Sequence, residues 1–300
     1  MRSVVLELLE NWKESLVLHP SLTELADAAP LAQDFATVRG VLKESLDLLG
    51  NALNHGEDPA ELAGWLSQVI TDVLHSPGLD AHVVLTGPVG RGDALPTSPV
   101  RWLAVVDSQE DPNEKISALL TEVGFIAEPI GAATREEWEQ RARAGEDPEV
   151  YLDAGTWVAA IAEVDDKALL QDALSSRPPA VETYEGLPSL DMVVNIRENL
   201  MIPTVKIARW AAHKAGSLAP TTAQRLVDAR GVLTNDEVDA LTQVWTSALS
   251  LQSKRWMDHI HDQETTAWEL PALQRATFGA SARLLSEVLR SVEAREIDTK

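Results

Sequence analysis

The 300-residue chain contains no cysteine, which excludes disulfide bonds and thiolate metal sites. It also lacks a run of 18 apolar residues, the length that would indicate a membrane-spanning helix, so we expect no membrane partner. The first residues carry acidic side chains within their apolar stretch and have no small-residue cleavage site, which argues against a signal peptide. Together these absences predict a cytoplasmic protein.

Basic residues are also scarce: 25 Lys and Arg stand against 47 Asp and Glu, a formal net charge of −22. Nucleic-acid-binding proteins present basic patches to phosphates, so the sequence predicts no nucleic-acid partner. The acidity is uneven. Residues 196–300 hold 13 basic and 13 acidic residues, so the whole excess lies in residues 1–195. A solvated surface is the simplest interpretation of that excess.

Helical periodicity dominates both ends of the chain. Near the N-terminus it predicts a helix over 4–18, a short one opened by a capping box at Ser21–Glu24, one over 31–54 and one from the Asp58-Pro59 start signal to residue 74. Two further helices are expected at 113–123 and 134–144, and a third is capped by Asp166 and ends at 175. Beyond residue 189, helices are predicted at 202–215, 222–229, 236–262 and 271–296, a pattern typical of a bundle.

Short apolar runs bounded by Gly and Pro predict strands at 82–86, 102–106, 125–130 and 155–164. We therefore predict an α+β fold in three parts: an N-terminal helical region (1–58), a small mixed-sheet α/β domain (59–180) and a C-terminal α-helical bundle (189–300). The Pro-containing stretch 177–188 is the expected interdomain linker.

The glycine-rich loop between the first two strands is the main candidate site. It reads Gly87-Pro88-Val89-Gly90-Arg91-Gly92, and its glycines allow a close backbone approach beside one cation. No Lys-Ser/Thr pair follows, so it is not a Walker loop, and the G-x-x-G-x-G spacing differs from the dinucleotide fingerprint. The spacing alone leaves both a phosphate-binding loop and a plain glycine turn open.

This segment resembles the signature of the DNA-polymerase-β-type nucleotidyltransferases, particularly the branch around protein-PII uridylyltransferase. The matching positions are Gly87, Gly90, Arg91, Gly92, Pro96 and Ser98, with Asp93 where the family has Glu. A second stretch, Pro203-x-x-Lys206-x-x-Arg209 followed by Thr222-x-x-Arg225-Leu226, resembles the helical domain that accompanies this nucleotidyltransferase type. The resemblance covers nearly the full length and is weak across the first 75 residues. It implies a nucleotidyltransferase-like domain at 59–180 and a substrate-binding-like bundle at 189–300.

The departures from the family pattern fall on its chemical positions. Pro88 replaces a small residue that helps to hold the triphosphate, and Pro99 and Arg101 stand where the family has its two metal-binding aspartates. Those aspartates hold two divalent ions that activate the attacking oxygen and stabilise the leaving pyrophosphate. The third carboxylate of the family is also missing from the expected strand at 155–164. We therefore predict no catalytic residue, no metal ligand and no cofactor.

What the resemblance leaves is a nucleotide- or anion-binding loop. Its expected residues are Gly87, Gly90, Arg91, Gly92, Asp93, Ser98 and Arg101. A guanidinium away from water needs a carboxylate partner, and Asp93 is the first candidate for Arg101. Trp102 is expected in the core, with covering a bound base as its alternative. Lys206, Arg209 and Arg225 are assigned equally to phosphate contacts and to helix-surface ion pairs. His259 and His261 point to different faces of a helix and predict a solvated helix end rather than a metal site.

Two function classes follow. The first, which we favour, is a catalytically degenerate nucleotidyltransferase that acts as a regulatory or scaffolding protein with a nucleotide or a protein partner. The second is an active enzyme that uses Mg²⁺ and non-standard carboxylates, such as Asp93, Asp107 or Glu163, to transfer a nucleotidyl group. The sequence gives no oligomeric state, and it does not name the nucleotide.

Overall fold

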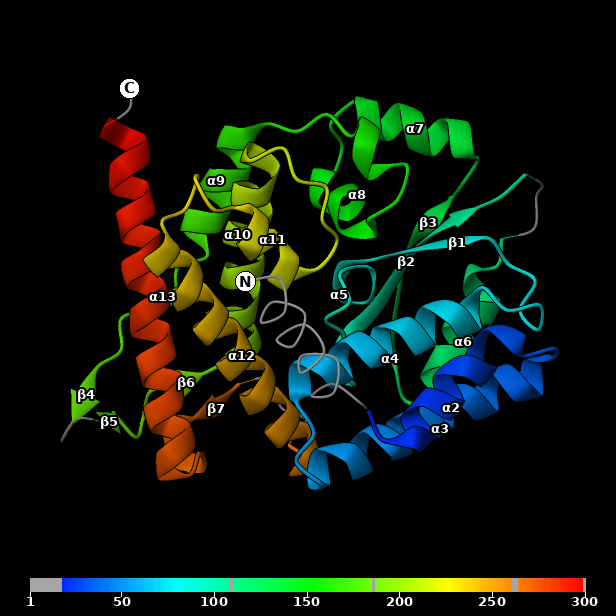
Figure 1. Cartoon of the computed structure of the whole chain (residues 1–300), viewed down its shortest axis with the longest axis horizontal. Coiled ribbons are helices and arrows are strands. Elements are labelled where there is room, and N and C mark those ends of the chain that lie inside the picture. Colours follow the sequence, from blue (N-terminus) through cyan, green and yellow to red (C-terminus); the bar gives the residue numbers. More distant parts are fainter. Residues whose placement is uncertain (1–17, 108–110, 185–186, 261–263, 299–300) are drawn as a thin grey trace, which may run out of the picture.

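The computed structural model describes residues 18–107, 111–184, 187–260 and 264–298. Helices form most of this part of the chain, and three strands make one small sheet, so the predicted α+β fold is confirmed. A sheet half and a helical-bundle half lie side by side (Figure 1). No helix in the described ranges combines the length and apolar character needed to cross a membrane.

The sheet half begins with helices that are positioned by caps. The structure has α2 (Pro20–Ala28), the short 3-10 helix η1 (Ala29–Leu31), α3 (Phe35–Asn54) and α4 (Pro59–Leu74). Asp58 accepts hydrogen bonds from the backbone N–H groups of Ala60 and Glu61, as its Asp-Pro signal predicted. The capping box expected at Ser21 is wrong, because His19 caps α2 and accepts from the Ser21 N–H. The helix predicted at 4–18 falls almost wholly outside the described residues.

Three strands form the sheet: β1 (Val83–Thr86), β2 (Pro99–Val105) and β3 (Ile126–Ala133), in that order. β1 and β2 pair antiparallel, whereas β2 and β3 pair parallel through the crossover helix α6 (Asn113–Val123). Gly124, in the left-handed conformation at φ 105°, ends α6 and returns the chain to β3. The three strands were predicted at these places to within a few residues.

Alternating side chains give the sheet two apolar faces. Leu85, Trp102 and Ala104 pack into the larger core with the helices α2, α3, α4 and α6. Leu103 faces the other way, into a smaller core with Trp138 and Tyr151. Trp102 is fully buried and its Nε1 donates to Asn113 Oδ1 at 2.7 Å, so it is a core residue and does not cover a ligand.

The strand predicted at 155–164 is wrong. Residues 155–164 contain only the short 3-10 helix η2 (Ala159–Ile161). Together with α7 (Arg135–Arg143), a predicted helix, and α8 (Pro148–Ala154), this segment covers the second face of the sheet. The Asp147-Pro148 pair, interpreted as a break, starts a helix, and Gly155 at φ 59° ends it. An apolar run of this length fits a strand or a buried turn equally well, which explains the error.

The bundle half contains the four helices predicted beyond residue 189, with shifts of up to five residues at their ends. They are α10 (Ile202–Lys214), α11 (Thr222–Asp228), α12 (Asn235–Met257) and α13 (Ala272–Asp298). The single π-helical turn η3 (Arg197–Met201), which was not predicted, and α9 (Asp166–Ser175), the helix predicted up to residue 175, pack with them. Thr234 and Glu237 form the predicted capping box of α12, whereas Asp165 rather than Asp166 caps α9. Because α12 ends at Met257, His259 is an exposed loop residue; His261 lies outside the described residues.

Two-stranded ribbons and a short 3-10 helix complete the bundle half. β4 (Thr183–Tyr184) pairs with β5 (Leu187–Pro188), and β6 (Val193–Val194) pairs with β7 (Thr265–Thr266), which leads into η4 (Ala267–Glu269). The β4–β5 hairpin falls within the expected linker, and its Pro188 packs closely against Gly279 of α13. The two halves also share an apolar junction in which Ala63 and Leu95 meet Val205, Trp245 and Leu249.

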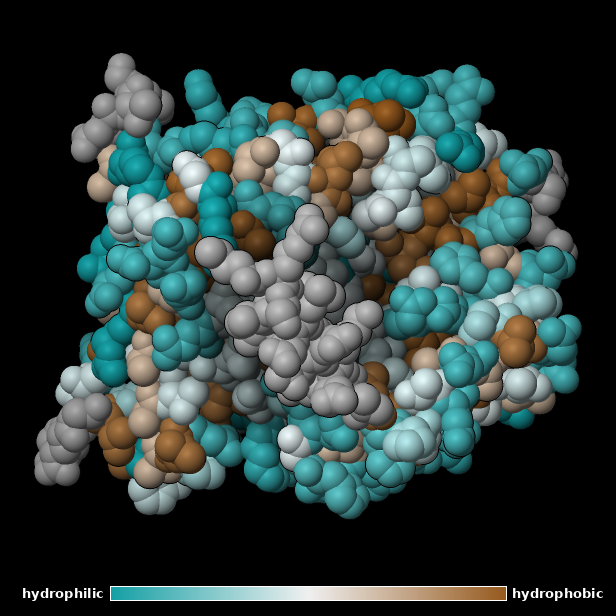
Figure 2. Space-filling view, viewed as in Figure 1, coloured by the Kyte–Doolittle hydropathy of each residue, from teal (hydrophilic) through white to brown (hydrophobic). Residues whose placement is uncertain are grey.

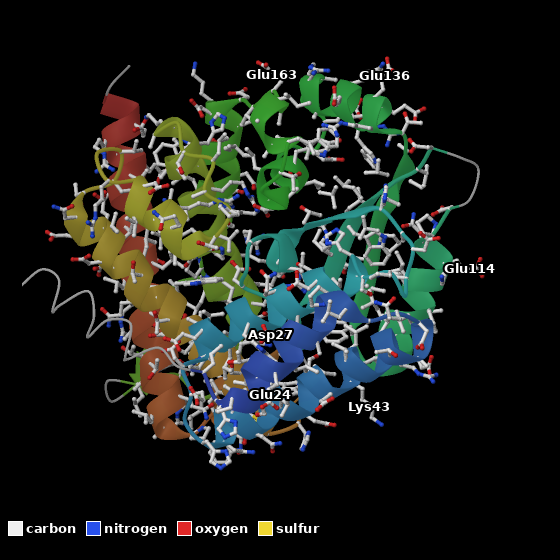
Figure 3. All side chains as sticks on the ribbon, turned by 45° about the vertical axis from the view of Figure 1, so that its right-hand side comes forward. Glu24, Asp27, Lys43, Glu114, Glu136 and Glu163 are labelled. Atoms are coloured by element: carbon white, nitrogen blue, oxygen red, sulfur yellow. The ribbon has the colours of Figure 1, made fainter. Side chains whose placement is uncertain are left out.

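Surface acids follow the uneven charge of the sequence. Glu24 and Asp27 on α2, Glu114 on α6 and Glu136 on α7 are all exposed (Figure 3). These side chains belong to residues 1–165, which hold 10 basic and 29 acidic residues. Exposed charges of one sign make this part of the surface repel other acidic surfaces.

Candidate functional site

A cavity of about 540 Å³ lies at the junction of the two halves. The sheet half contributes the loop after β1, given its helical turn by α5 (Gly87–Gly90), and the start of β2. The bundle half contributes η3, α10 and α12. The lining includes Gly87, Pro88, Arg91, Asp93, Ser98, Pro99, Arg101, Glu128, Asp153, Asp172, Arg197, Val205, Lys206, Arg209 and Trp245.

The structure brings together five of the seven residues proposed for the nucleotide site. Gly87, Arg91, Asp93, Ser98 and Arg101 line the junction cavity. Gly90 and Gly92 instead line a separate groove of about 460 Å³, between α4, β1 and residues 220–221. The glycine loop therefore forms a partition between two hollows, with only part of it facing the cavity.

Two of the loop glycines have identifiable steric roles. A Cβ on Gly90 would collide with the backbone carbonyl oxygens of Asp153 and Leu85, the second at only 2.7 Å. Gly87 adopts φ 59°, a conformation that favours glycine, and the side chain of Arg101 packs on it. This close packing explains why position 90 requires glycine, and the explanation needs no ligand.

Arg101 faces the cavity from β2, beside Pro99. Its predicted pairing with Asp93 is wrong: Arg101 Nε lies 3.4 Å from Glu128 Oε2, on the neighbouring strand position of β3. The side chains of Arg101 and Glu128 are 33% and 48% exposed, so water weakens this pair. A cation therefore sits loosely held at the position where the resembled family has a metal-binding aspartate.

Asp93 forms its hydrogen bonds with residues other than Arg101. Its Oδ2 accepts from Arg91 Nε at 3.1 Å and from Thr222 Oγ1 at 2.6 Å. Thr222 belongs to α11, so this carboxylate links the glycine loop to the bundle. The bundle motif seen in the sequence thus meets the loop motif directly.

Asp153, on α8, is the centre of a buried charge cluster. Arg91 Nη1 donates to its Oδ2 at 2.5 Å, and Arg225 Nη1 donates to its Oδ1 at 2.8 Å. Arg209 binds both oxygens, through Nε at 3.0 Å and Nη2 at 2.6 Å. All four side chains are less than 10% exposed. We call Arg91, Asp93, Asp153, Arg209 and Arg225 the junction cluster.

The charges of the cluster set its protonation. Burial by itself would raise the pKa of Asp153, but the charges of Arg209, Arg91 and Arg225 hold that pKa well below its usual range. Burial would likewise lower the pKa of Arg91, and Asp153 and Asp93 raise it above its ordinary value instead. Asp153 is therefore a permanent anion, and its oxygens are occupied by guanidinium groups.

Sequence reasoning missed Asp153 because it placed the adjoining segment in a strand. A signal was present: one carboxylate in the otherwise apolar run Val150-Tyr151-Leu152-Asp153-Ala154, after an Asp-Pro helix start. A lone acid in a buried stretch requires a cationic partner. The arginines that sequence reasoning divided between phosphates and surface ion pairs supply it, since Arg209 and Arg225 are buried on Asp153.

The donor set does not fit the two divalent ions of the resembled family. Pro99 offers no ligand and Arg101 is a cation, while guanidinium groups occupy both oxygens of Asp153 and one oxygen of Asp93. Nowhere in the described ranges do three or more His, Asp or Glu side chains gather as metal ligands would. We therefore derive no chemistry through a metal here.

The carboxylates considered for an active enzyme do not converge. Asp107 is exposed beyond the far end of β2 and does not line the cavity. Glu163 is exposed and borders a different hollow of about 570 Å³ (Figure 3). Asp93 alone lines the cavity, and it is bound by Arg91 and Thr222.

The bundle wall of the cavity is amphipathic. Lys206 Nζ pairs with Asp172 Oδ1 at 2.8 Å, and the Asp172 side chain is half exposed. Arg197, half-buried on η3, forms no ion pair within the described part of the chain. Met201, Val205 and the indole of Trp245 give the same wall an apolar surface.

Sequence comparison agrees with this division of the molecule. Residues 167–294 match the family described as "Putative nucleotidyltransferase substrate binding domain". The match covers the bundle half, including Lys206, Arg209, Thr222 and Arg225, and it supports a nucleotidyltransferase-like relationship for the chain. No curated protein matches the chain.

Proposed function

We propose that this protein is a catalytically degenerate member of the protein-PII uridylyltransferase-like branch, whose junction cavity binds a nucleotide or a similar anion without metal. In this proposal it acts as a regulatory or scaffolding protein and not as a transferase. The ligand phosphates lie near Arg101, and the apolar wall with Trp245 receives the base.

The proposal rests on Pro99 and Arg101, which line the junction cavity and stand where the resembled family has its two metal-binding aspartates. At an effective dielectric of about 20, two unit charges 4 Å apart interact by about 4 kcal/mol. A divalent ion near the Arg101 guanidinium would meet roughly twice that energy as repulsion, where the family's aspartate attracts it. Arg101 therefore disfavours binding of the divalent ions that a transferase of this type requires.

The same arginine favours an anion. A guanidinium supplies positive charge and planar donors that match a phosphate. Arg101 can change partner at small cost, because its contact with Glu128 is half-exposed and long at 3.4 Å. The cavity lining holds five basic and five acidic residues, so it is neutral in a chain of net charge −22. A neutral cavity with loosely paired cations admits an anion that the rest of the surface repels.

Thermal-shift and calorimetric titration with nucleoside mono-, di- and triphosphates test the proposal, each in EDTA and in Mg²⁺. We expect at least one nucleotide to stabilise the protein equally with and without the metal. Arg101→Gln should weaken that binding by about tenfold or more, since a charge-assisted hydrogen bond contributes about 1.5–3 kcal/mol. Arg39→Gln is the matched control, because Arg39 has a similar exposed pair with Glu122 on the far side of the sheet half.

The Pro99→Asp and Arg101→Asp double variant provides the converse test. It restores the family's carboxylates and should abolish metal-free binding while creating Mg²⁺-dependent binding. If Arg101→Gln and the double variant both keep the wild-type affinity for nucleotide in EDTA, Arg101 does not bind the anion.

The active-transferase alternative is tested with labelled nucleoside triphosphates and Mg²⁺, alone and with cell extract. We expect no pyrophosphate release. Labelled product that disappears in Asp93→Asn or Glu163→Gln would overturn degeneracy and establish the alternative.

A further inference from the structure

The β6–β7 ribbon of the bundle half has one buried and one exposed face. Val194 and Thr265 face inward and are buried, whereas Val193 is 54% exposed opposite Thr266. The ribbon continues past its strands, because the Trp268 N–H donates to the Leu190 carbonyl. Both of these side chains are also exposed, Leu190 to 41% and Trp268 to 72%. An apolar row therefore lies on the outer face of the ribbon.

Leu273, in the first turn of α13, adds to this row and is 79% exposed. We call Leu190, Val193, Trp268 and Leu273 the ribbon patch. These four make up half of the large hydrophobic side chains that are exposed in the described ranges, although they come from two short segments. Figure 2 shows apolar residues at its lower left, where Figure 1 places the start of α13. Such a gathering is typical of an interaction surface, whereas scattered apolar residues are not.

We infer that the ribbon patch is the contact surface of a homodimer of this chain. The charge distribution selects a second copy as the occupant. Residues 166–300, which contain the bundle half and the whole ribbon patch, hold 15 basic and 18 acidic residues, whereas residues 1–165 carry a net charge of −19. Two copies that meet through the ribbon patch bring their nearly neutral bundle halves together and keep their acidic sheet halves outward. At physiological salt, charges separated by more than about 8 Å are largely screened, so this arrangement avoids the repulsion.

The shape of the ribbon also suits a two-fold axis. A two-fold contact uses the same surface on both partners, so a self-complementary apolar row is sufficient. The exposed indole of Trp268 supplies the large aromatic anchor that such contacts favour.

Sedimentation velocity over a wide range of protein concentrations tests the inference with the full chain. We expect the wild type to reach twice the mass of one chain, and Trp268→Glu and Leu273→Glu each to raise the dissociation constant by about tenfold or more. Leu31→Glu and Leu218→Glu are matched controls, since both residues are exposed apolar side chains outside the patch, at 68% and 59%. The controls should keep the wild-type mass.

Circular dichroism and melting curves confirm that each variant is folded. If Trp268→Glu does not fold, Leu273→Glu carries the test, because its side chain is the more exposed. A wild type that stays at one chain mass at the highest concentration would overturn the inference. A dimer that both patch variants leave intact would place the interface elsewhere and overturn it equally. Dimerisation that appears only at high salt would show that the acidic halves approach each other, against the proposed arrangement.

Discussion

The junction cluster and a second set of ion pairs at the same cavity differ in how firmly their charges are held. The second set consists of Arg101–Glu128 and Lys206–Asp172, and we call it the mouth of the cavity. In the junction cluster, Arg209 binds Asp153 through two hydrogen bonds and the side chains are nearly inaccessible. At the mouth, the pairs Arg101–Glu128 and Lys206–Asp172 each include a half-exposed acid. Ion pairs of the same chemical kind are therefore tightly held in the cluster and loosely held at the mouth.

The difference separates structural charges from charges that a ligand can use. Breaking a buried pair leaves an uncompensated charge away from water and is strongly unfavourable. Breaking an exposed pair changes the free energy of folding very little. Changes in the junction cluster should therefore act on stability, and changes at the mouth should act on ligand affinity.

The largest expected effect comes from Asp153→Asn. It removes the counter-charge of three buried arginines, and we expect a loss of about 3–5 kcal/mol in the free energy of unfolding. Urea denaturation followed by circular dichroism measures it. Asp172→Asn, which removes the exposed partner of Lys206, should cost at most about 1 kcal/mol. Equal losses in the two variants would erase the distinction between cluster and mouth.

A smaller loss is expected from Gly90→Ala. The added Cβ meets the backbone carbonyl oxygens of Asp153 and Leu85, which cannot move without shifting α8 or β1. Such overpacking costs about 1–3 kcal/mol. Gly40→Ala in α3 is the control: its Cβ meets nothing within 4 Å, so it should stabilise the helix by about 0.5–1 kcal/mol. A neutral Gly90→Ala would mean that the loop is free to move away from the cluster.

Acid should weaken the cluster at a pH set by Asp153. Its folded pKa is depressed below the ordinary 3.8, so its contribution to stability is complete above that value. Below it the unfolded chain takes up a proton and the folded chain does not, and stability falls by up to about 1.4 kcal/mol per pH unit. Urea midpoints of the wild type and Asp153→Asn, compared as the pH is lowered through 3.8, isolate this group. Parallel pH profiles would contradict the assignment.

The smallest stability effect is expected at the mouth, from Glu128→Gln. It frees Arg101 from a long, half-exposed pair and should change the free energy of unfolding by less than about 1 kcal/mol. If the proposed anion site is correct, the same change should increase nucleotide affinity, because the ligand no longer displaces a carboxylate. Urea denaturation of the wild type and the variant measures the change in stability. Calorimetric titration with nucleotide in EDTA measures the change in affinity. Lower affinity would show that Glu128 assists binding rather than competing with it.

Sequence reasoning predicted much of this arrangement where signals were local. Asp58-Pro59, the box at Thr234–Glu237 and the apolar runs around the glycine loop located helices and strands to within a few residues. It placed Arg101 and Pro99 in the same unit as the loop, and the cavity contains both. It could not find Glu128 as the partner of Arg101, because that contact depends on the register between β2 and β3.

The cluster on Asp153 illustrates what sequence alone could not supply. Its members come from the loop, α8, α10 and α11, and each arginine that binds Asp153 lies between 56 and 72 positions away from it along the chain. No local pattern states which arginine meets which acid over such distances. The wrong strand at 155–164 drew attention away from Asp153, which binds arginines of both motifs.

The position of Asp153 also limits how the bundle can be used as a module. The segment that matches a known family begins at residue 167, whereas the anion that neutralises its Arg209 and Arg225 lies before that point. A bundle excised at the family boundary, or grafted onto another enzyme, would carry two cations without their counter-ion. Any such transplant requires an acid from its new host at the same place, so the portable unit of this protein is larger than the recognisable one.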